Sequence, residues 1–141
     1  GRQSLPNKFH FQQIGLDSKE GMVEFFPPAN SEYVSYSASP GVGQSKSGIS
    51  APVKPLESIM MELGHTNIDL LKMDIEGFEY RVIESILKVT VRPKQLLIEF
   101  HHGMYGNDRH QTYQAVESLC SAGYRLFYVA DGGREYGFVT A

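Results

Sequence analysis

Side chains that can carry acid–base or metal chemistry gather in two short segments of this sequence. Asp74 and Glu76 follow one apolar run, and Glu99 and His101 close another. Carboxylates and imidazoles accept or orient protons in active sites, and they also bind metal ions. Both segments would lie at the carboxyl ends of strands, where open α/β sheets bind their ligands.

Alternation along the strands predicts which of these groups share a face. Asp74 is expected on the face opposite Met73, and Glu99 and His101 are expected to share a face of the second strand. His102 should then point away from His101. If the two strands are neighbours, four polar groups converge on one crevice: Asp74, Glu76, Glu99 and His101.

Three interpretations of this crevice stay open. In the first, a carboxylate or the histidine accepts or orients the proton of an acceptor hydroxyl. In the second, the four groups hold a divalent metal ion, as in a metal-dependent hydrolase. The third is structural, because Glu76 and Glu79 lie in the first turn of a helix, where the dipole favours negative charge. Lys72 would then neutralise Asp74.

Hydrophobic periodicity predicts the elements that position these groups. Strands are expected at 9–14, 22–26, 68–73, 95–100, 125–130 and 136–140, and helices after Pro55, Phe78 and Asp108. Alternating strands and helices predict one α/β domain over residues 1–141 with a mostly parallel sheet. The tight turn at 131–133 makes the last strand antiparallel. The nearly continuous apolar run at 68–73 indicates a strand buried on both faces. Residues 31–52, rich in Ser, Gly and Pro, are expected to form a mobile loop.

Composition excludes several function classes. The net charge is -3, from 13 basic and 16 acidic residues, and there is no dense basic stripe, which argues against nucleic-acid binding. No apolar run is long enough to span a membrane. The single cysteine, Cys120, excludes an internal disulfide and a multi-cysteine zinc site. We expect Cys120 to be buried in a helix, and it favours a reducing, cytoplasmic compartment.

Residues 68–79 resemble the signature of the FkbM-type methyltransferases, an apolar strand ending in Lys-x-Asp-x-Glu-Gly before a helix that opens with Glu. Residues 96–101 resemble the family's next strand, 53–59 the segment that leads into the signature, and 15–26 a strand–turn–strand that follows the cofactor half. The resemblance implies a Rossmann-like fold and S-adenosylmethionine as cofactor. It also implies methyl transfer to an oxygen of a sugar, glycan or small-molecule hydroxyl.

The resemblance and the strand-end pattern together predict roles for individual residues. Three residues are expected to be catalytic: Asp74, Glu76 and His101. Two are expected to contact the cofactor: Asp74 and Met73. Three are expected to bind the acceptor: Glu99, His102 and Tyr105. No metal ligand is assigned.

The sequence departs from the family at its beginning. The family opens with a strand and a glycine-rich turn that cradles the cofactor, and no such pattern precedes Phe9. We therefore expect the N-terminal cofactor-binding half to be absent from this chain and the isolated chain to be inactive. The sheet edge left open would favour a homodimer. The alternative is a non-catalytic interaction module that presents this edge and the loop at 31–52 to a partner.

Overall fold

The computed structural model describes residues 9–27, 36–37 and 48–140, which form a mixed α/β fold with two mixed sheets. The strands are β1 (Gly15–Leu16), β2 (Gly21–Phe25), β3 (Ile49–Lys54), β4 (Leu70–Met73), β5 (Gln95–Glu99), β6 (Tyr124–Val129) and β7 (Glu135–Thr140). The helices are α1 (Leu56–Leu63), α2 (Glu79–Ile86) and α3 (Arg109–Ser121). The predicted α/β class is confirmed for this part of the chain.

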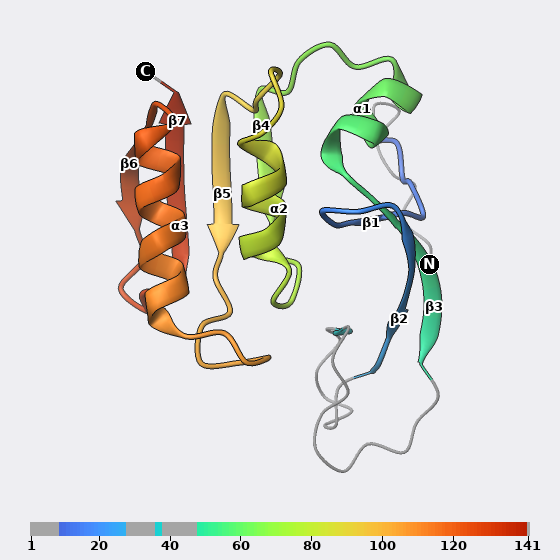
Figure 1. Ribbon diagram of the computed structural model, residues 1–141, viewed down its shortest axis with the longest axis horizontal. Helices are drawn as coiled ribbons and strands as arrows, with labels where there is room; N and C mark the ends of the chain where they lie inside the picture. The colour runs from blue at the N-terminus through green and yellow to red at the C-terminus, as the bar shows by residue number, and fades with distance from the viewer. Residues whose placement is uncertain (1–8, 28–35, 38–47, 141) are drawn as a thin grey trace.

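The larger sheet has the strand order β4-β5-β7-β6. β4 pairs with β5 in parallel, and β7 lies antiparallel between β5 and β6. The antiparallel last strand is therefore confirmed, and the turn at Asp131–Gly133 that makes it closes with a hydrogen bond of 2.8 Å from Gly133 N to Ala130 O. The mostly parallel sheet that the sequence predicted is wrong. The hairpin of β6 and β7 puts β7 antiparallel beside β5, which leaves β4 and β5 as the parallel pair among the described strands of this sheet. Helices α2 and α3 lie side by side on one face of this sheet (Figure 1). A Rossmann-like topology for the whole domain stays a prediction.

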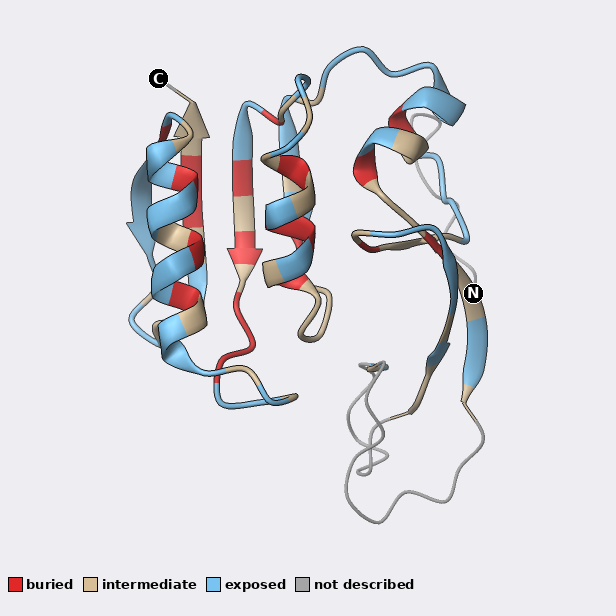
Figure 2. Ribbon diagram, in the orientation of Figure 1, coloured by how far each residue is buried: buried red, intermediate tan, exposed pale blue. Residues whose placement is uncertain are grey.

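The hydrophobic core lies between this sheet and its two helices (Figure 2). Alternate residues of β5 and β7 face the helices, and Leu96, Ile98 and Phe138 have no more than 2% exposed surface. Helix α2 contributes Val82, Ile83 and Ile86, as its apolar spacing predicted. Helix α3 begins with the predicted capping box, in which Asp108 and Gln111 exchange hydrogen bonds with each other's backbone.

The smaller sheet packs against the beginning of α2. Its central strand, β3, pairs with β1 in parallel and with β2 antiparallel. The turn after β1 contains Asp17, which forms an ion pair with Arg81 of α2 at 2.7 Å. The Arg81 guanidinium lies 3.5 Å from the ring centroid of Phe78, and Phe78 contacts Phe25 of β2. These contacts hold the smaller sheet beside the segment that joins β4 to α2.

Two predicted boundaries of the first half differ from the structure. The strand expected at 9–14 is wrong, because these residues have no regular structure and the strand is confined to Gly15–Leu16. An aromatic run needs a partner strand to become a strand, and Phe11 is 72% exposed. Residues 49–52 of the expected loop belong to β3. Most of that loop (31–35 and 38–47) lies outside the described residues, so its mobility stays a prediction.

Two burial predictions in the second half are also wrong. β4 is an edge strand rather than a strand buried on both faces, and Leu70 is 51% exposed. Cys120 is exposed rather than buried, because α3 turns Thr112, Ala115 and Leu119 toward the core. Among the described residues no helix is long and apolar enough to cross a membrane. Dimerisation through the β4 edge stays a prediction.

Candidate functional site

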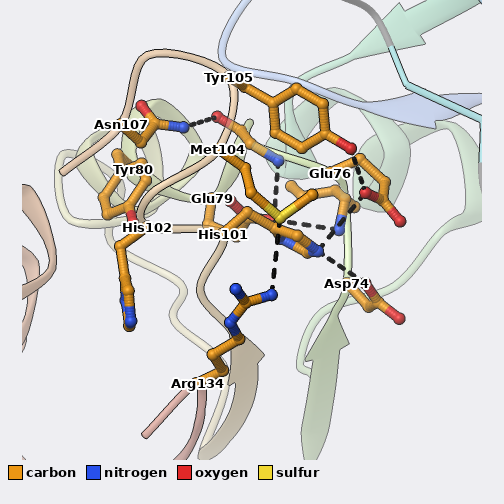
Figure 3. Close-up of polar contacts among 12 residues, drawn as sticks. Asp74, Glu76, Glu79, Tyr80, His101, His102, Met104, Tyr105, Asn107 and Arg134 are labelled. Atoms are coloured by element: carbon orange, nitrogen blue, oxygen red, sulfur yellow. Dashed lines mark hydrogen bonds and ion pairs between the residues drawn. The ribbon is translucent and has the colours of Figure 1, made fainter. Parts of the chain in front are cut away.

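The segment between β4 and α2 brings polar side chains to the carboxyl ends of two neighbouring strands. β4 and β5 pair in parallel with Met73 opposite Ile98, which confirms that the two strands are adjacent. The chain then turns sharply, because Glu76 and Gly77 adopt positive φ angles of 51° and 100°. This turn lies beside the segment that follows β5 and carries His101. Four residues gather here as a strand-end cluster: Asp74, Glu76, Glu79 and His101 (Figure 3).

Glu79 is the buried anchor of the strand-end cluster. Its side chain has no exposed surface, and Oε1 lies 2.8 Å from Nδ1 of His101. The same oxygen accepts hydrogen bonds from the backbone N–H groups of Ile75 at 3.3 Å and Gly77 at 3.1 Å. Oε2 of Glu79 has no hydrogen-bond partner among the described residues. One carboxylate oxygen therefore fixes both the turn after β4 and the ring of His101.

The other nitrogen of His101 faces two carboxylates. Nε2 lies 3.7 Å from Oδ1 of Asp74 and 3.5 Å from Oε2 of Glu76. Glu76 is itself held by Tyr105, whose hydroxyl donates a hydrogen bond of 2.7 Å to Oε2. His101 is 4% exposed, whereas the Asp74 side chain is 41% exposed. Asp74 is therefore the member of the strand-end cluster that reaches solvent most freely.

The local charges shift two pKa values. Burial alone would lower the pKa of His101, but the hydrogen bond to Glu79 and the negative charges of Glu79, Glu76 and Glu99 outweigh burial and raise it. Burial and the hydrogen bond to Glu76 raise the pKa of Tyr105 to about 12. The Tyr105 phenol therefore stays protonated at neutral pH and remains the donor to Glu76.

Gly77 is required at its position by both conformation and space. A Cβ at this residue would lie 2.8 Å from Cδ2 and 3.1 Å from Cβ of Tyr105, and φ is +100°. We expect Gly77→Ala to lower the free energy of unfolding by about 1–3 kcal/mol from backbone strain alone. Urea denaturation measures this loss, with Gly132→Ala as the matched control because nothing lies within 4 Å of its added Cβ. Equal losses in the two variants would contradict this role for Gly77.

The other residues predicted for the site lie apart from the strand-end cluster. Glu99 lines a separate pocket of about 170 Å³ together with Lys72 and Glu135. As predicted, His102 points away from His101: its Nδ1 lies 3.2 Å from Oγ1 of Thr112, and it lines a pocket of about 270 Å³. Burial, and the charges of Arg109, Arg134 and His101, lower the pKa of the His102 imidazole.

Met73 and Lys72 have different surroundings from each other. The Met73 side chain is fully buried in the core. Its predicted contact with the cofactor stays a prediction, and it would have to be made by the backbone of Met73. Lys72 forms the expected ion pair with Asp74, at 3.9 Å between Nζ and Oδ2. Both side chains of this pair are exposed, so the pair contributes little to stability.

The sequence interpretation missed the central role of Glu79, which it treated as a charge at a helix N-terminus. A signal for burial was present in the spacing. Glu79, Val82, Ile83 and Ile86 follow the i, i+3, i+4, i+7 pattern of one helix face. A carboxylate at the first position of an apolar stripe is buried with the stripe, and it then needs a partner. The partner, His101, lies 22 residues away.

The strand-end cluster can hold positively charged groups. One ligand atom each from Asp74, Glu76 and His101 can lie within 4.8 Å of the other two, which is a spacing suited to a metal ion. The carboxylates also suit the sulfonium of S-adenosylmethionine. The two pockets beside the carboxyl ends of the strands, about 170 and 270 Å³, are smaller than the roughly 300–1,000 Å³ of usual ligand sites. The described residues therefore fit the charged centre of that cofactor rather than all of it.

Comparison with known proteins places residues 3–126 in the family model described as the Methyltransferase FkbM domain. A human (Homo sapiens) protein named "Probable methyltransferase-like protein 24" is 32% identical over 85 residues. That alignment covers 53% of this chain and 23% of the human protein. No solved structure matches the chain.

Proposed function

The chain belongs to the FkbM methyltransferase family, and from this premise we propose that it serves S-adenosylmethionine-dependent transfer of a methyl group to the oxygen of a sugar or small-molecule hydroxyl. The observation that carries this proposal is the strand-end cluster. A buried carboxylate, Glu79, holds His101 at 2.8 Å, and the partly exposed carboxylate of Asp74 lies on the other side of the imidazole. This arrangement supports a role for Asp74 as proton acceptor, because open α/β sheets bind their ligands at the carboxyl ends of their strands.

Within this proposal, Asp74 is the catalytic residue. When bound, S-adenosylmethionine supplies an electrophilic methyl group on a sulfonium, so the protein's part is alignment and removal of a proton. Asp74 accepts the proton of the acceptor hydroxyl. His101 and Glu76 orient Asp74 and the hydroxyl, and Tyr105 keeps Glu76 in place through its hydrogen bond. Glu99 and His102, which line pockets beside the strand-end cluster, are proposed to contact more distant parts of the acceptor.

Cofactor binding is proposed to need more than the described residues. The small size of both strand-end pockets supports this view. The chain also spans only 23% of the human relative's length. We therefore propose that the isolated chain lacks methyltransferase activity and that the active site is completed by other parts of the domain.

Calorimetric titration with S-adenosylmethionine and S-adenosylhomocysteine tests this proposal. Two proteins are compared: the 141-residue chain and a version extended upstream in its parent gene. We expect saturable binding by the extended protein and none by the shorter chain. Binding by the shorter chain would contradict the need for other segments while supporting the methyltransferase proposal. The absence of binding by both proteins would overturn the methyltransferase proposal itself.

A further inference from the structure

We propose that the strand-end cluster binds a divalent transition-metal ion, best matched by Mn²⁺, through Asp74, Glu76 and His101. These three residues each offer one ligand atom, and the three atoms lie within 4.8 Å of one another. Methyl transfer from a sulfonium does not itself require a metal ion, so this inference goes beyond the proposed function. Only the role suggested for the ion in catalysis rests on that function.

The distances around His101 fit a shared cation better than direct hydrogen bonds. Nε2 lies 3.5 Å from Glu76 and 3.7 Å from Asp74, whereas strong hydrogen bonds between charged groups are about 2.7–2.9 Å long. Metal–ligand bonds of about 2.1 Å put neighbouring ligand atoms roughly 3–3.5 Å apart. Small rotations of the Asp74 and Glu76 side chains would therefore bring all three ligand atoms within bonding distance of one ion.

The Glu79–His101 pair prepares the imidazole to act as a ligand. Histidines that bind metals almost always donate their other ring N–H to a carboxylate or carbonyl, which fixes the tautomer and the ring orientation. Here Nδ1 of His101 lies 2.8 Å from the carboxylate of the fully buried Glu79, and Nε2 faces the two other carboxylates. In the tautomer that donates from Nδ1 to Glu79, the lone pair of Nε2 is available to a metal ion. Tyr105 orients Glu76 in the same manner. Two of the three ligands are thus held by supporting hydrogen bonds.

The strand-end cluster carries an excess of negative charge, which also favours binding of a cation. Three carboxylates surround a single imidazole, and Oε2 of the buried Glu79 has no hydrogen-bond partner among the described residues. Buried negative charge of this kind is costly unless it is paired. Within the described part of the chain, the ion pair of the nearby Lys72 is with the exposed Asp74, at 3.9 Å. A divalent ion at the centre would compensate the excess charge.

The ligand types indicate the class of ion. Two carboxylates with one imidazole suit Mn²⁺, because carboxylate and water ligands favour Mg²⁺, Ca²⁺ and Mn²⁺ while imidazole favours transition metals. Three protein ligands leave coordination positions open for water or for the acceptor hydroxyl. Asp74 would bind the ion through Oδ1 and keep Oδ2 available to accept the hydroxyl proton. The ion would then lower the pKa of a hydroxyl that it binds.

Mn²⁺ titration of the metal-free, 141-residue chain tests the site, with free Mn²⁺ followed by electron paramagnetic resonance. We expect saturable binding of one ion per chain. Asp74→Asn and Glu76→Gln should each weaken binding at least about tenfold. Glu79→Gln should weaken it about 10–100-fold, because the neutral amide keeps an acceptor for His101 but loses the negative charge that makes the imidazole a stronger ligand. Glu99→Gln is the matched control, because it removes one negative charge at the neighbouring strand end without removing a ligand. Circular dichroism shows that each variant is folded.

Co²⁺ in place of Mn²⁺ provides a second measurement of the same site. Imidazole ligation alters the visible absorption bands of Co²⁺, and His101→Gln should abolish this change. The absence of saturable Mn²⁺ binding, or equal weakening by Glu99→Gln and Asp74→Asn, would overturn the metal site. Neither titration uses S-adenosylmethionine or an acceptor. A negative result would therefore leave the methyltransferase proposal to be decided by calorimetry.

Discussion

Glu79→Ala is expected to lower the free energy of unfolding by about 3–5 kcal/mol, which is the usual cost of removing one partner from a buried charged pair. The wild-type Oε1 accepts from His101 at 2.8 Å and from the backbone N–H groups of Ile75 and Gly77. Alanine leaves all three donors without this acceptor in a site that excludes water, and it also leaves a cavity in the core. The turn that carries Asp74 and Glu76 would lose its anchor.

Urea denaturation followed by circular dichroism measures this effect, with two further variants of the same helix as controls. Glu79→Gln retains an oxygen that can accept the three hydrogen bonds, so its loss should be only about 1–2 kcal/mol. Glu84→Ala removes an exposed carboxylate from α2 and should change stability by less than about 0.5 kcal/mol. A Glu79→Ala protein as stable as Glu84→Ala would contradict the anchoring role.

Asp74→Asn is expected to reduce the rate of methyl transfer about 10²–10⁴-fold, the usual contribution of a general base. Asparagine has nearly the same shape as aspartate but cannot accept the proton of the acceptor hydroxyl. The side chain is 41% exposed, so the fold should tolerate the change. The rate is measured as S-adenosylhomocysteine formation by the upstream-extended protein with a panel of sugar and small-molecule hydroxyl acceptors.

Asp69→Asn is the matched control for this measurement. Asp69 precedes β4, its side chain is 80% exposed, and its ion-pair partner is Lys94 rather than a member of the strand-end cluster. We expect the control to keep the wild-type rate within about twofold, since surface changes of this kind are nearly neutral. If Asp74→Asn kept more than about a tenth of the wild-type rate, another group would have to accept the proton.

Local patterns in the sequence were sufficient to predict most of the elements around the site. The alternation of strands and helices after residue 55, the capping box at Asp108 and the tight turn before β7 all match the structure. Each of these features depends on interactions over a few residues, which the sequence displays directly. The same patterns placed Asp74 and His101 at strand ends, and the structure shows that the two strands are neighbours.

The tertiary structure decided the exposure of several side chains that the sequence predicted wrongly, and it decided which groups meet. β4 is not buried on both faces although it is largely apolar, because it lies at the edge of the sheet that the described residues form; Leu70 is 51% exposed while Met73 is fully buried. Cys120 is exposed because contacts with α2 and the sheet select a different face of α3. Glu79 is buried because His101, from a distant part of the chain, supplies its partner. Burial and the pairing of side chains depend on elements far apart in the sequence, whereas periodicity and turn preferences act locally. The sequence alone could therefore place the strand ends but not the contacts within the strand-end cluster.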